Sequence, residues 1–184
     1  METTILYCDL ETYCETPIAY GSHKYAEKAE VLLWGYAINN EPAKVWDLTV
    51  EKKMPEDLKV ALDDVYAGKG FTVWHNGMMF DTIVLRHALG IDIPVERIVD
   101  TMVMAYQHGL PGALATLSEV LRLPQDKAKD KDGKRLVQLF CKPLGANRKL
   151  DRADRNTHPQ DWAHFVDYCR LDVEAEREVL RRLH

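Results

Sequence analysis

Two carboxylates stand two residues apart directly after an apolar run near the N-terminus. Asp9 and Glu11 follow residues 5–8 (ILYC), which have the character of a buried strand. Because alternate residues of a strand point to the same side, both acids should project together from the end of this strand. Carboxylates held side by side repel each other, and a divalent cation relieves that repulsion. A D-x-E pair occurs in many surface loops, so the preceding core strand is what favours a metal site here.

Two further groups of residues could serve the same chemistry. Asp81 is expected in the first or second turn of a helix after the buried strand 71–74, and Asn76 lies in the turn between them, where open α/β sheets bind ligands. Tyr168 and Asp172 are four residues apart in the final helix and share one face. Taken singly, each group also fits an ordinary turn or an amphipathic helix. Together they supply the four acids and the hydroxyl that two-metal phosphodiester hydrolysis needs.

The elements that must position these residues alternate between strands and helices. Strands are expected at 4–9, 31–39, 44–48, 71–74 and 98–99, with the second and third forming a hairpin. Helices are expected at 55–67, 78–89, 101–108, 114–121 and 134–141, before a long helix that Thr157 caps and that runs to about residue 183. Residues 13–30 are expected to form a loop. The pattern predicts a single α/β domain over residues 1–184 with a mixed sheet.

Length and composition exclude several classes of protein. The chain has 184 residues, 46% of them apolar and 29% charged, which suits one globular domain and is too apolar for a disordered tail. No apolar run approaches the ~18 residues of a membrane span, so no membrane partner is expected, and the N-terminus lacks the features of a secretory signal. The four cysteines form no CxxC pair, which predicts reduced thiols in a cytoplasmic protein.

Charge is distributed unevenly along the chain. Residues 122–155 hold eleven Lys or Arg and five acids, a net charge of +6, whereas the rest of the chain carries −11. Such a segment is either a solvated loop or a surface that attracts a polyanion. We predict that Lys127, Lys129 and Lys131 of this basic insertion, which spans about residues 122–156, contact the phosphates of a nucleic acid.

The acidic motifs, in this order, resemble the proofreading 3′→5′ exonuclease domain of DNA polymerases, which is DnaQ-like and belongs to the tyrosine-containing branch of the DEDD superfamily. Asp9 and Glu11 match the first motif, Asp81 the second, and Tyr168 with Asp172 the third. Residues 100–106 and 117–121 resemble family A polymerases, and residues 132–143 and 162–173 resemble those of bacteriophages specifically.

The resemblance implies a ribonuclease-H-like fold with a five-stranded mixed sheet. It implies an enzyme, a metal-dependent 3′→5′ exonuclease that releases 5′-mononucleotides from the 3′ end of single-stranded or frayed DNA. The implied cofactors are two divalent ions, Mg²⁺ or Mn²⁺. Asp9, Glu11 and Asp172 would hold the first ion, and Asp9 with Asp81 the second. Glu11 and Tyr168 would orient the attacking water.

The resemblance also implies that Thr12 and Asn76 contact the terminal nucleotide or its phosphate. His75 is expected to be structural rather than a general base. The expected setting is the cytoplasm of a bacterial or phage-infected cell, with a role in DNA replication. The domain would act alone or with a polymerase module in the same or another chain. Two alternatives stay open, namely an exoribonuclease of the same superfamily and a non-catalytic nucleic-acid-binding module, although the intact acids argue against the second.

Overall fold

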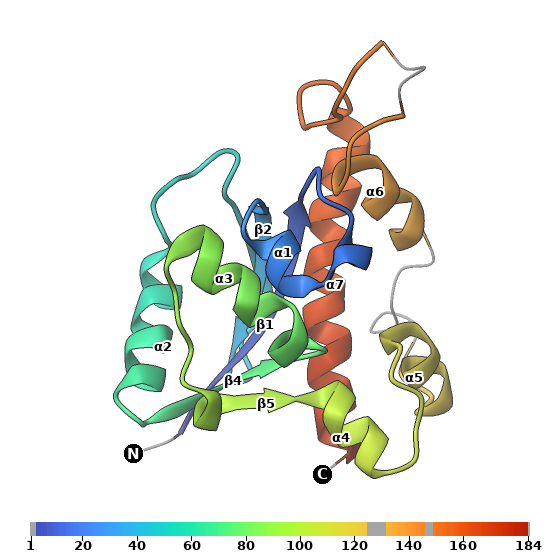
Figure 1. Cartoon of the computed structure of the whole chain (residues 1–184). Helices are drawn as coiled ribbons and strands as arrows, with labels where there is room; N and C mark the ends of the chain where they lie inside the picture. The colour runs from blue at the N-terminus through green and yellow to red at the C-terminus, as the bar shows by residue number, and fades with distance from the viewer. Residues whose placement is uncertain (1–2, 125–131, 146–148, 184) are drawn as a thin grey trace.

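The computed structural model describes residues 3–124, 132–145 and 149–183. Within these residues, five strands form one mixed sheet in the order β3-β2-β1-β4-β5 (Figure 1). The strands are β1 (Thr4–Tyr13), β2 (Glu30–Ile38), β3 (Lys44–Asp47), β4 (Gly70–Trp74) and β5 (Ile98–Asp100). The pairs β1–β2 and β2–β3 are antiparallel, whereas β1–β4 and β4–β5 are parallel. The predicted five-stranded mixed sheet is therefore confirmed.

Helices cover both faces of this sheet. The α-helices are α1 (Ser22–Ala26), α2 (Glu56–Tyr66), α3 (Asp81–Leu89), α4 (Thr101–Gln107), α5 (Leu114–Val120), α6 (Gly133–Phe140) and α7 (Pro159–Leu183). Short 3₁₀ turns occur at η1 (Ile18–Tyr20), η2 (Gly77–Met79) and η3 (Val95–Arg97). None of the helices in the described part of the chain has the length and apolar character needed to cross a membrane.

Side-chain alternation along β1 separates the two packing layers. Leu6 packs in one cluster with Leu58 of α2 and Val84 of α3. Its neighbour Tyr7 packs in another cluster with Val173 of α7. Helices α2 and α3 therefore lie on one side of the sheet and α7 on the other (Figure 1). The alternation that builds the core also decides which helix the two acids of β1 face.

Helix α7 comes close to the centre of the sheet because β2 carries a glycine there. Gly35 is paired with Asp9 across the β1–β2 ladder. A Cβ atom at Gly35 would lie 2.9 Å from Cys169 Sγ and from Val173 Cγ2, and 3.0 Å from the Cys169 carbonyl oxygen. The absence of a side chain thus lets the helix backbone approach the sheet beside Asp9.

A buried ion pair links the C-terminal half of α7 to the connection between β2 and β3. Arg177 and Glu174 pair with each other, with side chains only 6% and 5% exposed. Arg177 also donates to the Glu41 carbonyl over 2.7 Å, and Glu174 accepts from the Ala43 amide over 3.0 Å. Removing one partner of such a pair leaves a buried charge without compensation, which costs about 3–5 kcal/mol. This pair fixes the position of the helix along the sheet.

Three local predictions are wrong. Strand β1 does not end at Asp9 but continues to Tyr13, because Leu33 and Val31 of β2 keep pairing with it beyond Asp9. Residues 13–30 are not all loop, since η1 and α1 form there, and α1 is too short to show a helical period. Helix α7 begins at Pro159, and the Thr157 hydroxyl accepts from the Asp154 amide over 2.9 Å rather than capping the helix.

Replacing Gly35 by Ala should push α7 away from the sheet. The added methyl group meets backbone as well as side chains, so we expect the free energy of unfolding to fall by about 1–3 kcal/mol in a urea titration. Gly145→Ala is the matched control, because nothing lies within 4 Å of a Cβ atom there. Equal stability of the two variants would show that the close approach of α7 does not depend on Gly35.

Candidate active site

Three carboxylates from two elements converge on the α7 side of the sheet. Asp9 and Glu11 of β1 and Asp172 of α7 each offer an oxygen atom, and these atoms lie within 4.8 Å of one another. Glu11 and Asp172 are 7% and 4% exposed, and Asp9 is half-buried. Mg²⁺ prefers carboxylate oxygens as ligands, and a bound cation would offset the repulsion within this group. The donor set therefore fits a divalent metal ion.

Asp81 approaches these acids from the N-terminal end of α3. Its Oδ1 accepts a hydrogen bond of 3.3 Å from the backbone amide of Leu10, the residue between Asp9 and Glu11. Burial raises the pKa of Asp81 to about 7, and the charge of Asp100 acts in the same direction. Asp81 thus lies near Asp9, Glu11 and Asp172, but it is not one of the acids whose oxygen atoms lie within 4.8 Å of one another.

Asp100 holds the turn that delivers Asp81. Its carboxylate accepts from the backbone amides of Asn76 and Met78, over 3.0 and 3.1 Å, and from the amide of Met102 over 3.0 Å. Asn76 has a left-handed backbone with φ 68°, a conformation that asparagine tolerates better than most residues. One buried carboxylate therefore caps α4 and fixes the β4–α3 turn. Sequence reasoning gave Asp100 no such role, and the available signal was an Asp directly before a helix.

Tyr168 lies under α6, with its hydroxyl group at the carboxylates. Its ring stacks on Phe165, with ring centroids 6.3 Å apart. The ring also packs tightly against Gly133 of α6, since a Cβ atom at that glycine would lie only 2.1 Å from Tyr168 Cε2. The hydroxyl is hydrogen-bonded to Asp172. Burial, followed by the charges of Asp172 and Glu11, raises the pKa of Tyr168 far above its ordinary value. The hydroxyl therefore stays protonated at neutral pH, so it can orient a neighbouring group by hydrogen bonding but cannot act as a general base.

Two thiols border the same acids. Cys141 Sγ is 3.7 Å from Glu11 Oε2, and Cys169 Sγ is 3.9 Å from Asp9 Oδ2. Burial raises the pKa of both thiols well above the ordinary value, with the neighbouring carboxylates adding to the effect. Both thiols therefore stay neutral and offer weak S–H donors to the acids. Sequence reasoning missed these contacts, because a lone cysteine looks like a small apolar residue.

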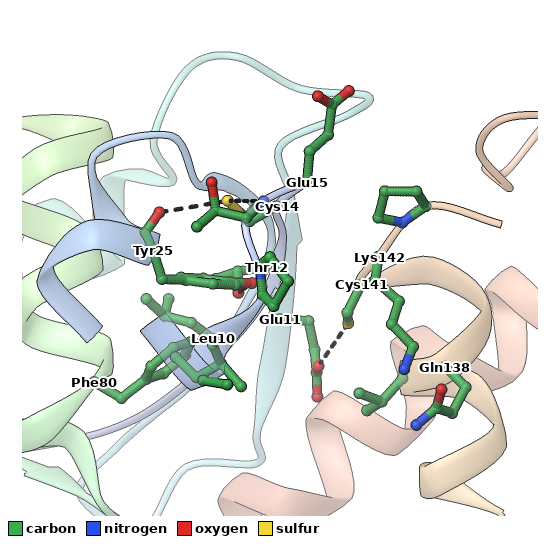
Figure 2. A pocket seen from close by; sticks show the side chains of 16 residues that line it. Leu10, Glu11, Thr12, Cys14, Glu15, Tyr25, Phe80, Gln138, Cys141 and Lys142 are labelled. Carbon is green, nitrogen blue, oxygen red and sulfur yellow. Dashed lines mark hydrogen bonds between the residues drawn. The ribbon is translucent and has the colours of Figure 1, made fainter. Parts of the chain in front are cut away.

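A pocket of about 570 Å³, which we call the Glu11 pocket, opens between β1 and α6 (Figure 2). Leu10, Tyr25 and Phe80 lie on one side of it, and Gln138 and Lys142 lie on the other. Glu11 stands between these two walls and faces Cys141, as Figure 2 shows. Its size and mixed lining are typical of a small-ligand site.

The predicted substrate contact Thr12 also lines the Glu11 pocket, and its hydroxyl lies 2.8 Å from the Tyr25 hydroxyl. Asn76 lines a different pocket of about 390 Å³, the Asn76 pocket, together with Asp9 and Asp172. Because Glu11 lies within 4.8 Å of those two acids, the two pockets meet at the carboxylates. The structure thus places Thr12 and Asn76 in two different pockets, each of which is bordered by at least one of the acids.

The remaining predicted residues fall outside this geometry. Lys127, Lys129 and Lys131 lie outside the described residues. Both ring nitrogens of His75 are engaged, Nδ1 with the Thr101 hydroxyl at 2.8 Å and Nε2 with the Gly112 carbonyl at 2.6 Å. His75 therefore ties β4 to the segment between α4 and α5, as its expected structural role requires.

No protein-family model matches the chain. The sequence is 32% identical over 184 residues to a DNA polymerase of Bacillus phage SP02, a match that covers 97% of this chain and 28% of the polymerase. The chain therefore corresponds to well under half of that relative.

Solved structures match the fold at low sequence identity. The catalytic core of RRP6 from Trypanosoma brucei matches with a TM-score of 0.60 and 17% identity, over 99% of this chain and 41% of that one. Brucella melitensis NrnC with bound Mg²⁺ matches with a TM-score of 0.56 and 15% identity, over 97% of this chain and 71% of that one. The family B DNA polymerase of the archaeon Pyrobaculum calidifontis matches with a TM-score of 0.52 and 18% identity, over 98% of this chain and 25% of that one.

At 15–18% identity, these solved structures bear on the fold of the chain. They confirm the predicted ribonuclease-H-like α/β fold.

The raised pKa of Asp81 predicts how the stability of the metal-free protein depends on pH. The pKa is near 3.8 when the chain is unfolded and about 7 when it is folded. The stability that neutral Asp81 contributes is therefore complete below pH 4 and is lost as the pH rises through 7. In EDTA, the free energy of unfolding should fall from about pH 4 to about pH 7 and level off above, and Asp81→Asn should flatten this dependence. An unchanged profile in that variant, matching the surface control Asp63→Asn, would contradict the assigned pKa.

Proposed function

We propose that this domain is a 3′→5′ exonuclease that acts on DNA ends with the help of two divalent ions. The observation that carries the proposal is the convergence of Asp9, Glu11 and Asp172 within 4.8 Å at the meeting point of two pockets. Phosphodiester hydrolysis places negative charge on the phosphate and on the leaving oxygen. Acids without a cation would repel that charge, so this geometry is best suited to metal-assisted chemistry.

The residues fit the two ions unequally. Asp9, Glu11 and Asp172 would hold one ion, since their oxygens already share one small volume. Asp9 and Asp81 would hold the second, and the hydrogen bond from Leu10 keeps Asp81 at the edge of β1. When bound, such ions activate the attacking water and stabilise the departing 3′ oxygen.

The other side chains position the substrate and the water. Tyr168, held neutral under α6, donates a hydrogen bond, and with Glu11 it would orient the water toward the phosphorus. The terminal nucleotide would occupy the Glu11 pocket, where Tyr25 and Phe80 offer aromatic surface and Lys142 offers a positive charge. The preceding nucleotide would lie along the Asn76 pocket, so the scissile phosphate would sit at the acids.

DNA is the proposed substrate because of the sequence relationship to a phage DNA polymerase. The chain covers only 28% of that polymerase, and we propose that the domain removes misincorporated 3′ nucleotides in association with a polymerase module. An exoribonuclease would use the same carboxylates, so cleavage of DNA and of RNA is compared directly in the assay below.

The decisive assay uses 5′-labelled single-stranded DNA and RNA of the same sequence. We expect Mg²⁺ or Mn²⁺ to support stepwise shortening of the DNA from its 3′ end, and EDTA to abolish it. Asp9→Asn and Asp172→Asn should lower the rate by orders of magnitude, because each replaces one carboxylate oxygen by an amide nitrogen and removes the negative charge that would hold the ion. Asp167→Asn, exposed on the same helix, is the matched control. Shortening in EDTA would exclude the metal mechanism, and faster RNA cleavage would reassign the substrate.

The second kinetic prediction concerns Tyr168. The Tyr168→Phe change keeps the ring between Phe165 and Gly133 but removes the hydroxyl. One positioned donor contributes on the order of 2–4 kcal/mol to a transition state. We therefore expect kcat to fall tens- to several-hundred-fold with KM nearly unchanged, whereas Tyr66→Phe on the exposed surface of α2 should change neither. A raised KM with an unchanged kcat would instead make Tyr168 a substrate contact.

A further inference from the structure

Glu176 is a buried acid one helical turn beyond Asp172 on α7, and no part of the proposed chemistry uses it. Its side chain is 1% exposed, and its Oε1 atom has no hydrogen-bond partner among the described residues. The carboxyl group contacts the backbone amide of Cys8, the residue directly before Asp9. Glu176 therefore connects α7 to β1 at the base of the carboxylate site.

The surroundings of Glu176 are unfavourable for an acid. Burial raises its pKa well above the ordinary value, and the charges of Asp9, Asp81 and Asp100 act in the same direction. A buried carboxyl with an unused oxygen destabilises a fold, and an apolar side chain of similar size would fill the same space at less cost. An acid at this position therefore does not increase the stability of the fold. A role in the site would explain its presence, since active sites commonly trade stability for function.

A direct role as metal ligand does not fit the geometry. Among the described residues, the acids whose oxygens share one ligand-sized volume are Asp9, Glu11 and Asp172, and Glu176 is not one of them. Glu176 and Asp172 are four residues apart and face the sheet together. The Asp172 carboxylate lies near that of Asp9, whereas Glu176 contacts the backbone amide of Cys8, the residue before Asp9.

We propose that Glu176 is a positioning residue, which holds the β1 backbone at Cys8 and thereby fixes Asp9 relative to Asp172. This inference rests on the proposed metal-dependent function of the site. The carboxyl group has both an acceptor for the amide and a second polar atom that lacks a hydrogen-bond partner among the described residues. A methionine would keep the volume but lose both, whereas a glutamine would keep an acceptor and supply an N–H donor in place of the unpartnered oxygen.

The test compares Glu176→Met, Glu176→Gln and the control Glu178→Gln, which removes an acid from the same helix where it pairs with Arg181. In EDTA, Glu176→Met should melt at least about 2 °C higher than the wild type, because an unfavourable buried acid is gone. The same variant should need about tenfold more Mg²⁺ for half-maximal activity and show a smaller Mg²⁺-induced rise in Tm, with KM for DNA unchanged. Glu176→Gln should restore most of the loss, and Glu178→Gln should behave as the wild type.

Three outcomes would overturn the inference. A Glu176→Met variant with wild-type metal dependence would show that the acid positions nothing. A Glu176→Gln variant as impaired as Glu176→Met would show that the negative charge itself is required, which makes Glu176 a ligand. A Glu176→Met variant that melts lower than the wild type would make the acid structural. If the wild type cleaves no DNA, the proposed function fails, and the Mg²⁺-induced shift in Tm still tests the role of Glu176.

Discussion

Electrostatic repulsion between buried carboxylates is the constraint on which the rest of this structure depends. Two unit charges at the observed separation of up to 4.8 Å repel by on the order of 3 kcal/mol at an effective dielectric constant of ~20. Rigid elements of the fold hold the carboxylates in place against this repulsion. Asp9 and Glu11 both pair with β2 in the sheet, and the Glu174–Arg177 pair anchors the helix that carries Asp172. Neutral donors line the acids, namely the hydroxyl of Tyr168 and the thiols of Cys141 and Cys169.

The site also depends on the unequal lengths of two neighbouring strands. The pairing of β1 with β4 stops at Tyr7, but β1 continues to Tyr13. Beyond that point, side chains take the place of a neighbouring strand. The amide of Leu10 donates to Asp81, and the amide of Thr12 contacts the thiol of Cys141. The open edge of β1 therefore gathers groups from α3 and α6 around the two acids. Glu11 borders the Glu11 pocket, and Asp9 borders the Asn76 pocket.

Sequence reasoning could predict the parts of this arrangement that depend on periodicity. The alternation in β1 placed Asp9 and Glu11 on one side, and the spacing of four placed Tyr168 and Asp172 on one face of α7. Apolar runs bounded by turns gave all five strands. The extension of β1 to Tyr13 was not predictable, because it depends on pairing with β2 rather than on local hydrophobicity. Long-range packing likewise hid Glu176, which in the sequence is one of several acids on an amphipathic helix. The same applies to Cys141, whose contact with Glu11 joins residues 130 positions apart.

The most direct test of the metal-site interpretation is anomalous diffraction from crystals of the domain grown with Mn²⁺. Manganese prefers the same oxygen ligands as Mg²⁺ and scatters anomalously. The interpretation predicts a strong anomalous peak coordinated by Asp9, Glu11 and Asp172, which disappears when Asp9→Asn and Asp172→Asn are combined. A peak elsewhere, or no peak at saturating Mn²⁺, would contradict the claim that these carboxylates converge in order to hold a cation.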